Sequence, residues 1–396
     1  MPVSTRTALA IGLVVATAAA LTACSTSSTS TGSAGGSATT ASGPAVDLKG
    51  VCPATVVVQT DWNPEADHGH LYQLLGPNYT VDTSKKSVTG DLMANGKKTG
   101  VKIQIRVGGP AIGYASVSSQ MYQDKSITMG YVSTDEAVQD SAKLPTTAVF
   151  AENNISSLMV MWDPKTYPKV NTIKELGTSL EKTGGVLRYF SGSAYMDYLI
   201  GKGIVPASVA DGSYDGTPAK FVVGKGKDAQ QGFATAEPYI YQHEVSAWGK
   251  PVKFQLVSTV GYPTYPEAMS VRSADLTKLT PCLKKLVPVM QRADVDYFKN
   301  PAPTNKVITD LVTQYNNGWV YDESVANYAV KEMKKLKIAS DGTNGYVGDM
   351  DSARIQKLIE IDTPIFTKSG TTLKTGLKPS DLFTNEFIDK KISLGF

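Results

Sequence analysis

The segment that carries the most recognition chemistry covers residues 59–76, QTDWNPEADHGHLYQLLG. Asp61 and Asn63 can bind a polar ligand through hydrogen bonds, and Trp62 between them provides a flat apolar surface. His68 follows near the start of a predicted helix. The turn from a strand into a helix is where open α/β sheets bind ligands. We therefore expect these four residues to contact a small molecule; the alternative for each is a helix cap beside a buried tryptophan.

A second candidate site lies within residues 190–199, FSGSAYMDYL. Ser191, Gly192 and Ser193 are small residues between a predicted strand and a predicted helix. Free backbone N–H groups and the helix dipole at such a position attract an anionic or carbonyl group. We expect these residues, together with Tyr195, to face the ligand, and plain helix capping is the alternative interpretation.

Aromatic side chains recur at or beside the ends of the predicted strands. Flat rings bind heteroaromatic or cationic ligands by stacking, and each contact contributes roughly 0.5 to 1.5 kcal/mol. The alternative for any single tyrosine is core packing with its hydroxyl group at the rim. Glu237, which precedes Pro238, is expected to accept a hydrogen bond from the ligand or to bridge two lobes. The aromatic residues are Trp62, Tyr114, Tyr131, Tyr189, Tyr195, Tyr239, Tyr262 and Tyr265, of which Tyr114, Tyr239 and Tyr262 join the predicted ligand site.

Elements must position these side chains, and the apolar pattern predicts an α/β fold. Apolar runs of strand length alternate with helical patterns, which is typical of a largely parallel sheet. After residue 276 the pattern changes to amphipathic helices. The predicted strands cover residues 54–60, 101–107, 126–132, 147–153, 157–163, 185–190, 219–224, 234–241 and 252–259. The predicted helices between them include residues 68–75, 111–122, 173–182, 194–203 and 230–233.

The length of 396 residues exceeds what one hydrophobic core usually organises, so two lobes are expected. The first lobe is predicted from residues 51–150 and 243–396, with the C-terminal helices packed on it. Residues 151–242 form the predicted second lobe. Two crossings, near residues 150–156 and 241–252, would then join the lobes and act as a hinge.

The N-terminal residues predict export. Arg6 gives a short positive region, residues 8–21 are apolar, and small residues precede Cys24. An apolar run of about 14 residues is too short to span a bilayer, which needs about 20. Residues 21–24, LTAC, resemble a bacterial lipobox whose cysteine becomes lipidated; the alternative is a cleaved signal with a coincidental cysteine. Residues 1–23 are thus a predicted lipoprotein signal peptide, and residues 24–50, rich in Ser, Thr, Gly and Ala, a predicted flexible tether.

Two cysteines remain in the predicted mature body, Cys52 and Cys282. Such a pair in an exported protein is a disulfide candidate, and two unpaired thiols are the alternative. The histidines, His68, His70 and His243, form no zinc-ligand pattern with these cysteines. We therefore expect no metal ion and no cofactor.

Four stretches together resemble the type II periplasmic solute-binding proteins that carry thiamine-pyrimidine precursors, taurine, alkanesulfonates and nitrate. They are the Asp-Trp-Asn-Pro run with His68 and Tyr72, MGYVSTDEA at residues 129–137, GFATAEPYIY at residues 232–241 and LFTNEFID at residues 382–389. With the order of elements, the resemblance extends over nearly all of the mature chain. It implies a two-lobed fold with a double-crossover hinge and a ligand cleft between the lobes. The cleft residues that it implies are Asp61, Trp62, Asn63, His68, Ser133, Thr134, Asp135, Ser191, Gly192, Ser193 and Tyr195.

The resemblance also implies a function. We expect an extracytoplasmic lipoprotein, held at the cell membrane by lipidated Cys24, that binds a small nutrient and delivers it to the permease of an ABC importer. A monomer is expected. The aromatic residues favour a pyrimidine-like or other heteroaromatic ligand, whereas helix N-termini and hydroxyl groups suit a sulfonate or nitrate equally well.

Other classes of function fit the sequence less well. The net charge is +3, from 39 basic and 36 acidic residues, and the lysines are scattered, so nucleic acid is not expected as a partner. A pyrimidine-forming synthase shares the implied fold, but it carries a cysteine-rich, iron-associated motif that this chain does not have. Residues 129–137 also contain no histidine where the synthase is expected to carry its donor. We therefore expect no catalysis; a lipid-anchored adhesion or sensor protein, which needs no cleft, is a further alternative.

Overall fold

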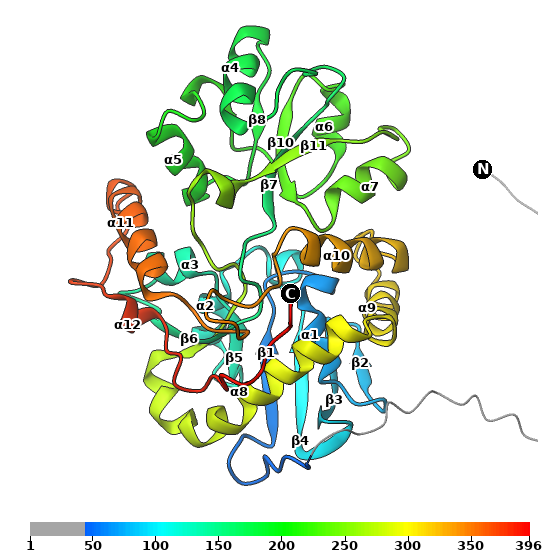
Figure 1. Ribbon diagram of the computed structural model, residues 1–396, viewed down its shortest axis with the longest axis vertical. Coiled ribbons are helices and arrows are strands. Elements are labelled where there is room, and N and C mark those ends of the chain that lie inside the picture. Colours follow the sequence, from blue (N-terminus) through cyan, green and yellow to red (C-terminus); the bar gives the residue numbers. More distant parts are fainter. Residues whose placement is uncertain (1–43) are drawn as a thin grey trace, which may run out of the picture. The chain divides into compact units, whose positions relative to one another are not determined.

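The computed structural model describes residues 44–396. The predicted signal peptide, Cys24 and most of the predicted tether lie outside the described residues. Within residues 44–396, no helix combines the length and the apolar character needed to cross a membrane. The strands of this part of the chain form two sheets, each accompanied by helices (Figure 1).

The first sheet contains seven strands of the described chain. Its central strand, β1, pairs in parallel with β4 and β5, whereas the pairs toward both edges are antiparallel. Val56 and Val58 of β1 are fully buried, as expected for a strand of β-branched residues with neighbours on both sides. In spatial order the strands are β2 (Thr80–Asp82), β3 (Ser87–Ala94), β4 (Lys97–Arg106), β1 (Thr55–Gln59), β5 (Met129–Tyr131), β12 (Ala268–Arg272) and β6 (Thr146–Ala151).

The second sheet, five strands among the described residues, lies above the first in Figure 1. Its spatial order is β11 (Lys253–Leu256), β7 (Leu158–Trp162), β10 (Ala229–Phe233), β8 (Leu187–Arg188) and β9 (Ala210–Asp211). The helices of this half are α4 (Ile173–Thr183), α5 (Ala194–Gly201), α6 (Ala219–Val223) and α7 (Glu237–His243). Local sequence fixes the bounds of α4, because Thr172 and Glu175 form a capping box and Gly184 ends the helix with a left-handed φ of 66°.

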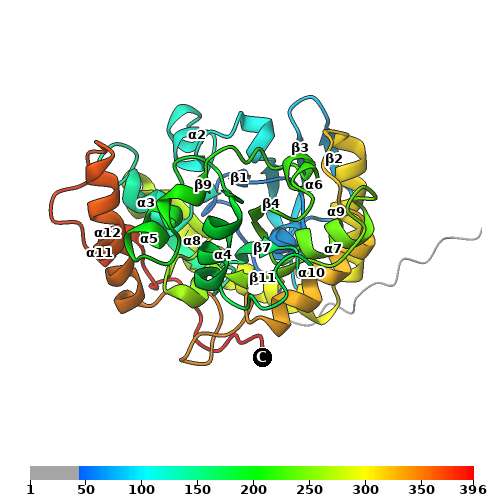
Figure 2. The same ribbon diagram turned by 90° about the horizontal axis from the view of Figure 1, so that it is seen from above.

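The remaining helices accompany the first sheet. They are α1 (Gly69–Gln73), α2 (Val117–Gln123), α3 (Thr134–Gln139), α8 (Leu276–Lys299), α9 (Ala302–Tyr315), α10 (Glu323–Lys335), α11 (Ser352–Lys368) and α12 (Pro379–Leu382). Helices α8 and α9 pack against α1. Helix α10 also contacts α7, and α11 contacts both α3 and α5, so the C-terminal helices touch both halves (Figure 2).

The chain passes between the sheets in two segments, one from β6 to β7 and one from β11 to β12. The first coincides with the predicted crossing near residues 150–156. The predicted second crossing at residues 241–252 is wrong, because β11 pairs with β7 and therefore belongs to the second sheet. The second sheet thus extends to Leu256, beyond the predicted lobe boundary at residue 242.

Three predicted elements have the opposite secondary structure. Residues 219–224 and 234–241, predicted as strands, form helices α6 and α7, and Pro238 in the first turn of α7 suits a helix start. Residues 230–233, predicted as a helix, form the inner strand β10. The sequence pattern missed this buried strand because two of its residues are glutamines. Their side chains are buried with hydrogen-bond partners on helices: Gln230 donates to the Tyr241 hydroxyl group, and Gln231 accepts from the Tyr195 hydroxyl group.

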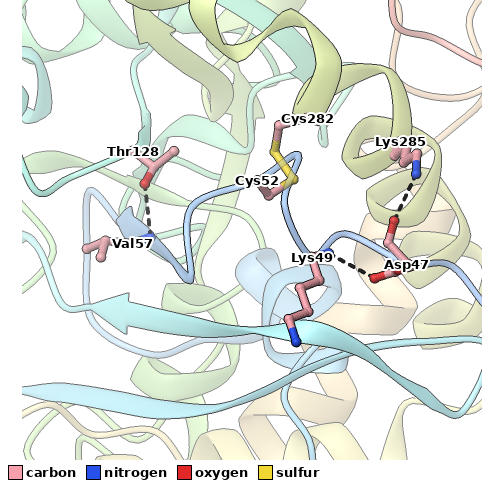
Figure 3. Close-up of a disulfide and its surroundings, with 7 residues drawn as sticks. All are labelled: Asp47, Lys49, Cys52, Val57, Thr128, Cys282 and Lys285. Atoms are coloured by element: carbon pink, nitrogen blue, oxygen red, sulfur yellow. Dashed lines mark hydrogen bonds between the residues drawn. A yellow bond between two sulfur atoms is a disulfide. The ribbon is translucent and has the colours of Figure 1, made fainter.

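The predicted disulfide is present between Cys52 and Cys282, whose Cα atoms lie 4.6 Å apart (Figure 3). It ties the segment that precedes β1 to helix α8, across 230 residues of sequence. The same segment is also held by Lys285 of α8, whose Nζ donates to the backbone oxygen of Asp47 at 3.0 Å. The disulfide therefore fixes α8 at the side of the first sheet where the described chain begins.

Removing this disulfide should destabilise the protein. A bridge that closes so long a loop restricts the unfolded chain strongly, and its loss typically lowers the free energy of unfolding by about 2–5 kcal/mol. We expect the Cys52→Ser/Cys282→Ser double variant to unfold at lower temperature and lower denaturant concentration than the wild type. A reducing agent should lower the stability of the wild type and leave that of the double variant unchanged.

Candidate functional site

Three carboxylates surround the buried imidazole of His68. Its Nε2 lies 3.0 Å from Oδ1 of Asp61, 3.9 Å from Oε1 of Glu65 and 4.0 Å from Oε1 of Glu267. We call these four residues the carboxylate–histidine cluster. The cluster forms where β1 runs into the first helical turn and where β12 begins, because β12 is antiparallel to β5 and starts at the edge where β5 ends. Asn153, just after β6, donates to Oε2 of Glu267 at 2.5 Å and orients it.

Asp67 connects this cluster to the second half of the molecule. Its Oδ2 accepts a hydrogen bond from Thr235 at 2.9 Å and one from Ser157 at 3.4 Å. Thr235 follows β10 and Ser157 precedes β7, so both donors belong to the second half of the molecule. A single buried carboxylate thus joins the two halves close to His68.

Burial dominates the protonation of the site. It raises the pKa of Glu65 and of Glu267 well above the usual value, and neighbouring carboxylates raise both further. The pKa of Asp67 rises to about 6 because burial outweighs its hydrogen bonds. Burial alone would lower the pKa of His68, but the hydrogen bond and charge of Asp61 outweigh it, so that pKa is raised.

Aromatic rings lie beside the cluster and connect the same two halves. The ring centroid of Trp62 lies 6.1 Å from that of Tyr114, 6.5 Å from Phe190 and 6.0 Å from Trp319. Phe190 follows β8 in the second half. We call Trp62, Tyr114, Phe190 and Trp319 the aromatic cluster. Tyr114 is 56% exposed, so part of this cluster faces solvent.

Gly108 and Gly109 allow the chain to pack closely against Trp62 and the end of β1. Gly109 has a left-handed φ of 53°, and a Cβ atom there would lie 2.5 Å from the Trp62 ring. A Cβ on Gly108 would meet the backbone oxygen of Thr60 at 2.1 Å. Glycine is therefore required at both positions by the close approach of the β1 turn.

The arrangement suits a flat, positively charged ligand. The carboxylates supply negative charge once they are ionised, and aromatic faces attract cations and stack with heteroaromatic rings. The strongest charge effects on Glu65, Asp67 and Glu267 come from other carboxylates and from His68. A negatively charged ligand at this position would therefore lie among carboxyl groups, with the imidazole of His68 already paired with Asp61.

The predicted cleft residues Ser133, Thr134 and Asp135 belong to a separate network. Thr134 bonds to Thr264 and Tyr265, and Asp135 accepts from Thr264 at 3.0 Å and from Tyr262 at 3.2 Å. Ser133 is the N-cap of α3 without a capping bond from its side chain. The Tyr262 ring also lies 5.6 Å from that of Tyr198 in α5. The structure thus brings Ser133, Thr134, Asp135 and Tyr262 together at the crossing from β11 to β12.

The other predicted residues have varied surroundings. Ser191 and Gly192 are exposed, and Ser193 donates to the backbone oxygen of Phe190 at 2.7 Å. Tyr195 is buried and donates to Gln231. Asn63 accepts from Asn317 at 2.7 Å, and the charge of Glu237 acts on Glu65. The ring of Tyr239 packs on those of His243 and Tyr328, on the side of α10.

Several residues of the site were not among the predicted contacts. Glu65 and Asp67 lie inside the first loop, and only their burial beside His68 distinguishes them from solvated acids. Glu267 directly precedes strand β12. Because β12 is antiparallel to β5, this position lies at the edge of the sheet that carries the site, but the sequence did not predict the antiparallel pairing. Trp319 comes from the segment between α9 and α10, about 250 residues from Trp62 in sequence, and carries no local signal.

No family model matches the chain, and no curated protein matches its sequence. Solved structures do match. The periplasmic aliphatic sulphonate binding protein of Escherichia coli has a TM-score of 0.50 and 11% identity, covering 81% of this chain and 88% of that chain. The alkanesulfonate-binding protein of Xanthomonas axonopodis pv. citri, bound to MOPS, has a TM-score of 0.51 and 11% identity, covering 84% of this chain and 99% of that chain. The chain therefore has the fold of type II periplasmic binding proteins, as predicted.

Replacing Glu237 by glutamine should flatten the pH dependence of stability. Burial raises the pKa of Glu237 from 4.5 to about 7. A carboxyl group that holds its proton more tightly in the folded protein stabilises the fold at low pH, and this stabilisation is lost as the pH rises through about 7. From pH 4 to pH 8, the free energy of unfolding of Glu237→Gln should rise by about 3 kcal/mol relative to the wild type, measured by chemical denaturation. Glu244→Gln, which changes an exposed glutamate at the end of the same helix, should show no such relative change.

Proposed function

We propose that this chain, with the fold of type II periplasmic binding proteins, is the solute-binding lipoprotein of an ABC uptake system. It works outside the cytoplasmic membrane, holds a small molecule between its two halves and passes it to the permease. The fold, the disulfide and the predicted export signal support this assignment together. The two crossings between the sheets support a hinge that opens and closes around the ligand.

We further propose that the ligand is a flat cation, such as a positively charged nitrogen heterocycle. The observation that carries this proposal is the carboxylate–histidine cluster next to the aromatic cluster, at the place where both halves meet. The carboxylates would pair with the positive charge and Trp62 would stack on the ring. The sulfonate and nitrate alternative is disfavoured because the anion would face Glu65, Asp67 and Glu267, while the imidazole of His68 is already paired with Asp61.

Closure would follow from the contacts that ligand and protein share. In the described structure Asp67, the neighbour of His68 in the chain, already accepts a hydrogen bond from Thr235, and Trp62 lies beside Phe190, so both clusters adjoin contacts between the halves. A ligand that pairs with Asp61, the most accessible member of the carboxylate–histidine cluster at 40% side-chain exposure, would be covered when these contacts form. The closed form would then be the form that the permease recognises.

Ligand screening by thermal shift tests the proposed ligand class. Cationic heteroaromatic compounds, with thiamine as the first probe, should raise the melting temperature, whereas taurine, alkanesulfonates and nitrate should not. Affinity should increase from pH 5 to pH 8, because a cation binds the ionised carboxylates, whose raised pKa values keep them protonated at low pH. Stabilisation by an anion alone, or an affinity that falls with rising pH, would contradict the proposal.

The stacking role of Trp62 is tested by truncation. Trp62→Ala should weaken binding of the best cationic ligand about tenfold, since one stacking contact contributes about 1 kcal/mol or more. Tyr239→Ala is the matched control, because Tyr239 packs on Tyr328 and His243. Equal effects of the two substitutions in isothermal titration would refute the stacking contact.

Lipid anchoring is tested separately. In a bacterial host, the wild-type chain should incorporate labelled palmitate and fractionate with membranes. Cys24→Ala should lose the label and be released from the membrane fraction, because the cysteine thiol is the proposed attachment point. Release of the wild-type protein into the soluble fraction, without label, would contradict the anchor.

A further inference from the structure

A second group of ionisable side chains lies deeper in the first half than the carboxylate–histidine cluster. His70 belongs to α1, Glu152 directly follows β6, and Asp294 belongs to α8. One nitrogen or oxygen atom from each lies within 4.8 Å of the others. His70 and Asp294 are 0% exposed and Glu152 is 2% exposed. We call these three residues the inner triad.

Apolar and aromatic side chains surround the inner triad. The ring of His70 lies 5.4 Å from that of Phe150 and 6.1 Å from that of Tyr131. Oε1 of Glu152 pairs with Nδ1 of His70, and Oε2 accepts a hydrogen bond from the Tyr131 hydroxyl group at 2.7 Å. Two members of the triad are therefore oriented toward each other and held in place by a tyrosine.

Asp294, the third member of the inner triad, forms no hydrogen bond in this network. Neither of its carboxylate oxygens has a hydrogen-bond partner among the described residues, although both are buried. A buried carboxylate is destabilising by several kcal/mol unless it is paired, and a polar group without any partner is uncommon in a protein interior. Asp294 nevertheless directs an oxygen toward His70 and Glu152.

Protonation of Asp294 and binding of a cation are the two ways to offset the cost of burying its unpaired carboxylate. Burial raises the pKa of Glu152 and of Asp294 well above the usual value and lowers that of His70 to about 3, so the imidazole is neutral. A protonated Asp294 would still have a hydroxyl group without an acceptor. A divalent cation would instead give Asp294 a partner, and two carboxylates with a neutral imidazole would balance its charge.

We propose that His70, Glu152 and Asp294 bind a divalent transition-metal ion. One imidazole nitrogen with two carboxylate oxygens is a ligand set that suits Zn²⁺ or a related first-row ion better than Ca²⁺ or Mg²⁺, which prefer oxygen ligands alone. The Tyr131 hydroxyl group would act as the hydrogen-bond donor that orients the Glu152 ligand. The spacing of histidine and cysteine in the sequence does not indicate this site, because its ligands lie on three elements and are separated by up to 224 residues.

The role of such an ion would be structural. It would link α1, the end of β6 and α8, and α8 is the helix that the disulfide ties to the segment before β1. His70 also follows His68 by two residues, so the ion would fix the turn that carries the carboxylate–histidine cluster. The inference is independent of the ligand proposed above, since the inner triad is closed to solvent.

Metal analysis of the purified mature chain tests the proposal. Elemental analysis should find about one equivalent of a transition metal, and removing it with a chelator should lower the melting temperature by about 5 °C or more. Zn²⁺ added to the stripped protein should restore the melting temperature, and Ca²⁺ or Mg²⁺ should not. The absorption spectrum of the Co²⁺-loaded wild-type protein should indicate nitrogen and oxygen ligands. This measurement does not depend on the folding of a variant.

Substitutions locate the ion. Asp294→Asn keeps the shape of the side chain but should reduce the metal content at least tenfold and abolish the response to chelator. Asp362→Asn is the matched control, because Asp362 is equally buried, bonds to Tyr262 and lies in a different core region. It should retain the metal, and so should Glu267→Gln, which alters the carboxylate–histidine cluster instead.

Two results would overturn the proposal. The first is that the wild-type protein binds no transition metal, that its melting temperature does not respond to chelator or Zn²⁺, and that Asp294→Asn is as stable as the wild type. This result would mean that Asp294 is simply a protonated carboxyl group. The second is loss of the metal in Glu267→Gln with retention in Asp294→Asn, which would assign the ion to the outer cluster.

Discussion

The constraint on which the site depends is the burial of carboxylates where the two sheets meet. Glu65, Asp67 and Glu267 all have raised pKa values because they are withdrawn from water and lie near one another. A protein interior tolerates such groups only when they are protonated, hydrogen-bonded or paired with a cation. Ion pairing with the positively charged ligand proposed above would relieve this unfavourable arrangement.

The scaffold holds these groups in place from several directions. The turn after β1 brings Trp62 onto Gly109, the disulfide fixes α8 beside the first sheet, and Asn153 orients Glu267. Contacts between the halves include the hydrogen bond from Thr235 to Asp67, and apolar residues of both sheets also share buried clusters. The hinge motion of the proposed solute-binding protein would have to loosen both kinds of contact.

Sequence patterns predicted elements well where the local pattern and the environment agree. Helix α4 has a capping box and a glycine stop, and it was predicted within one residue at its C-terminal end. The prediction gave β10 as a helix and the region of α7 as a strand. Gln230 and Gln231 are polar yet buried, and residues 234–241 are largely apolar, so neither pattern indicated the right element. The second crossing was misplaced for a related reason, since strand pairing of β11 with β7 has no local signature.

The sequence by itself determined the fold class, the cysteine pair that forms the disulfide and the first loop with Asp61, Trp62 and His68, because each depends on a local motif or a simple count. Tertiary structure alone decided which residues join them. Glu267, Trp319 and Asp294 come from distant segments, and burial gives their side chains an electrostatic or packing role that residue type does not reveal. The proposal of a positively charged ligand likewise rests on tertiary structure, because it depends on how many carboxylates the folded chain brings together and not on any one of them.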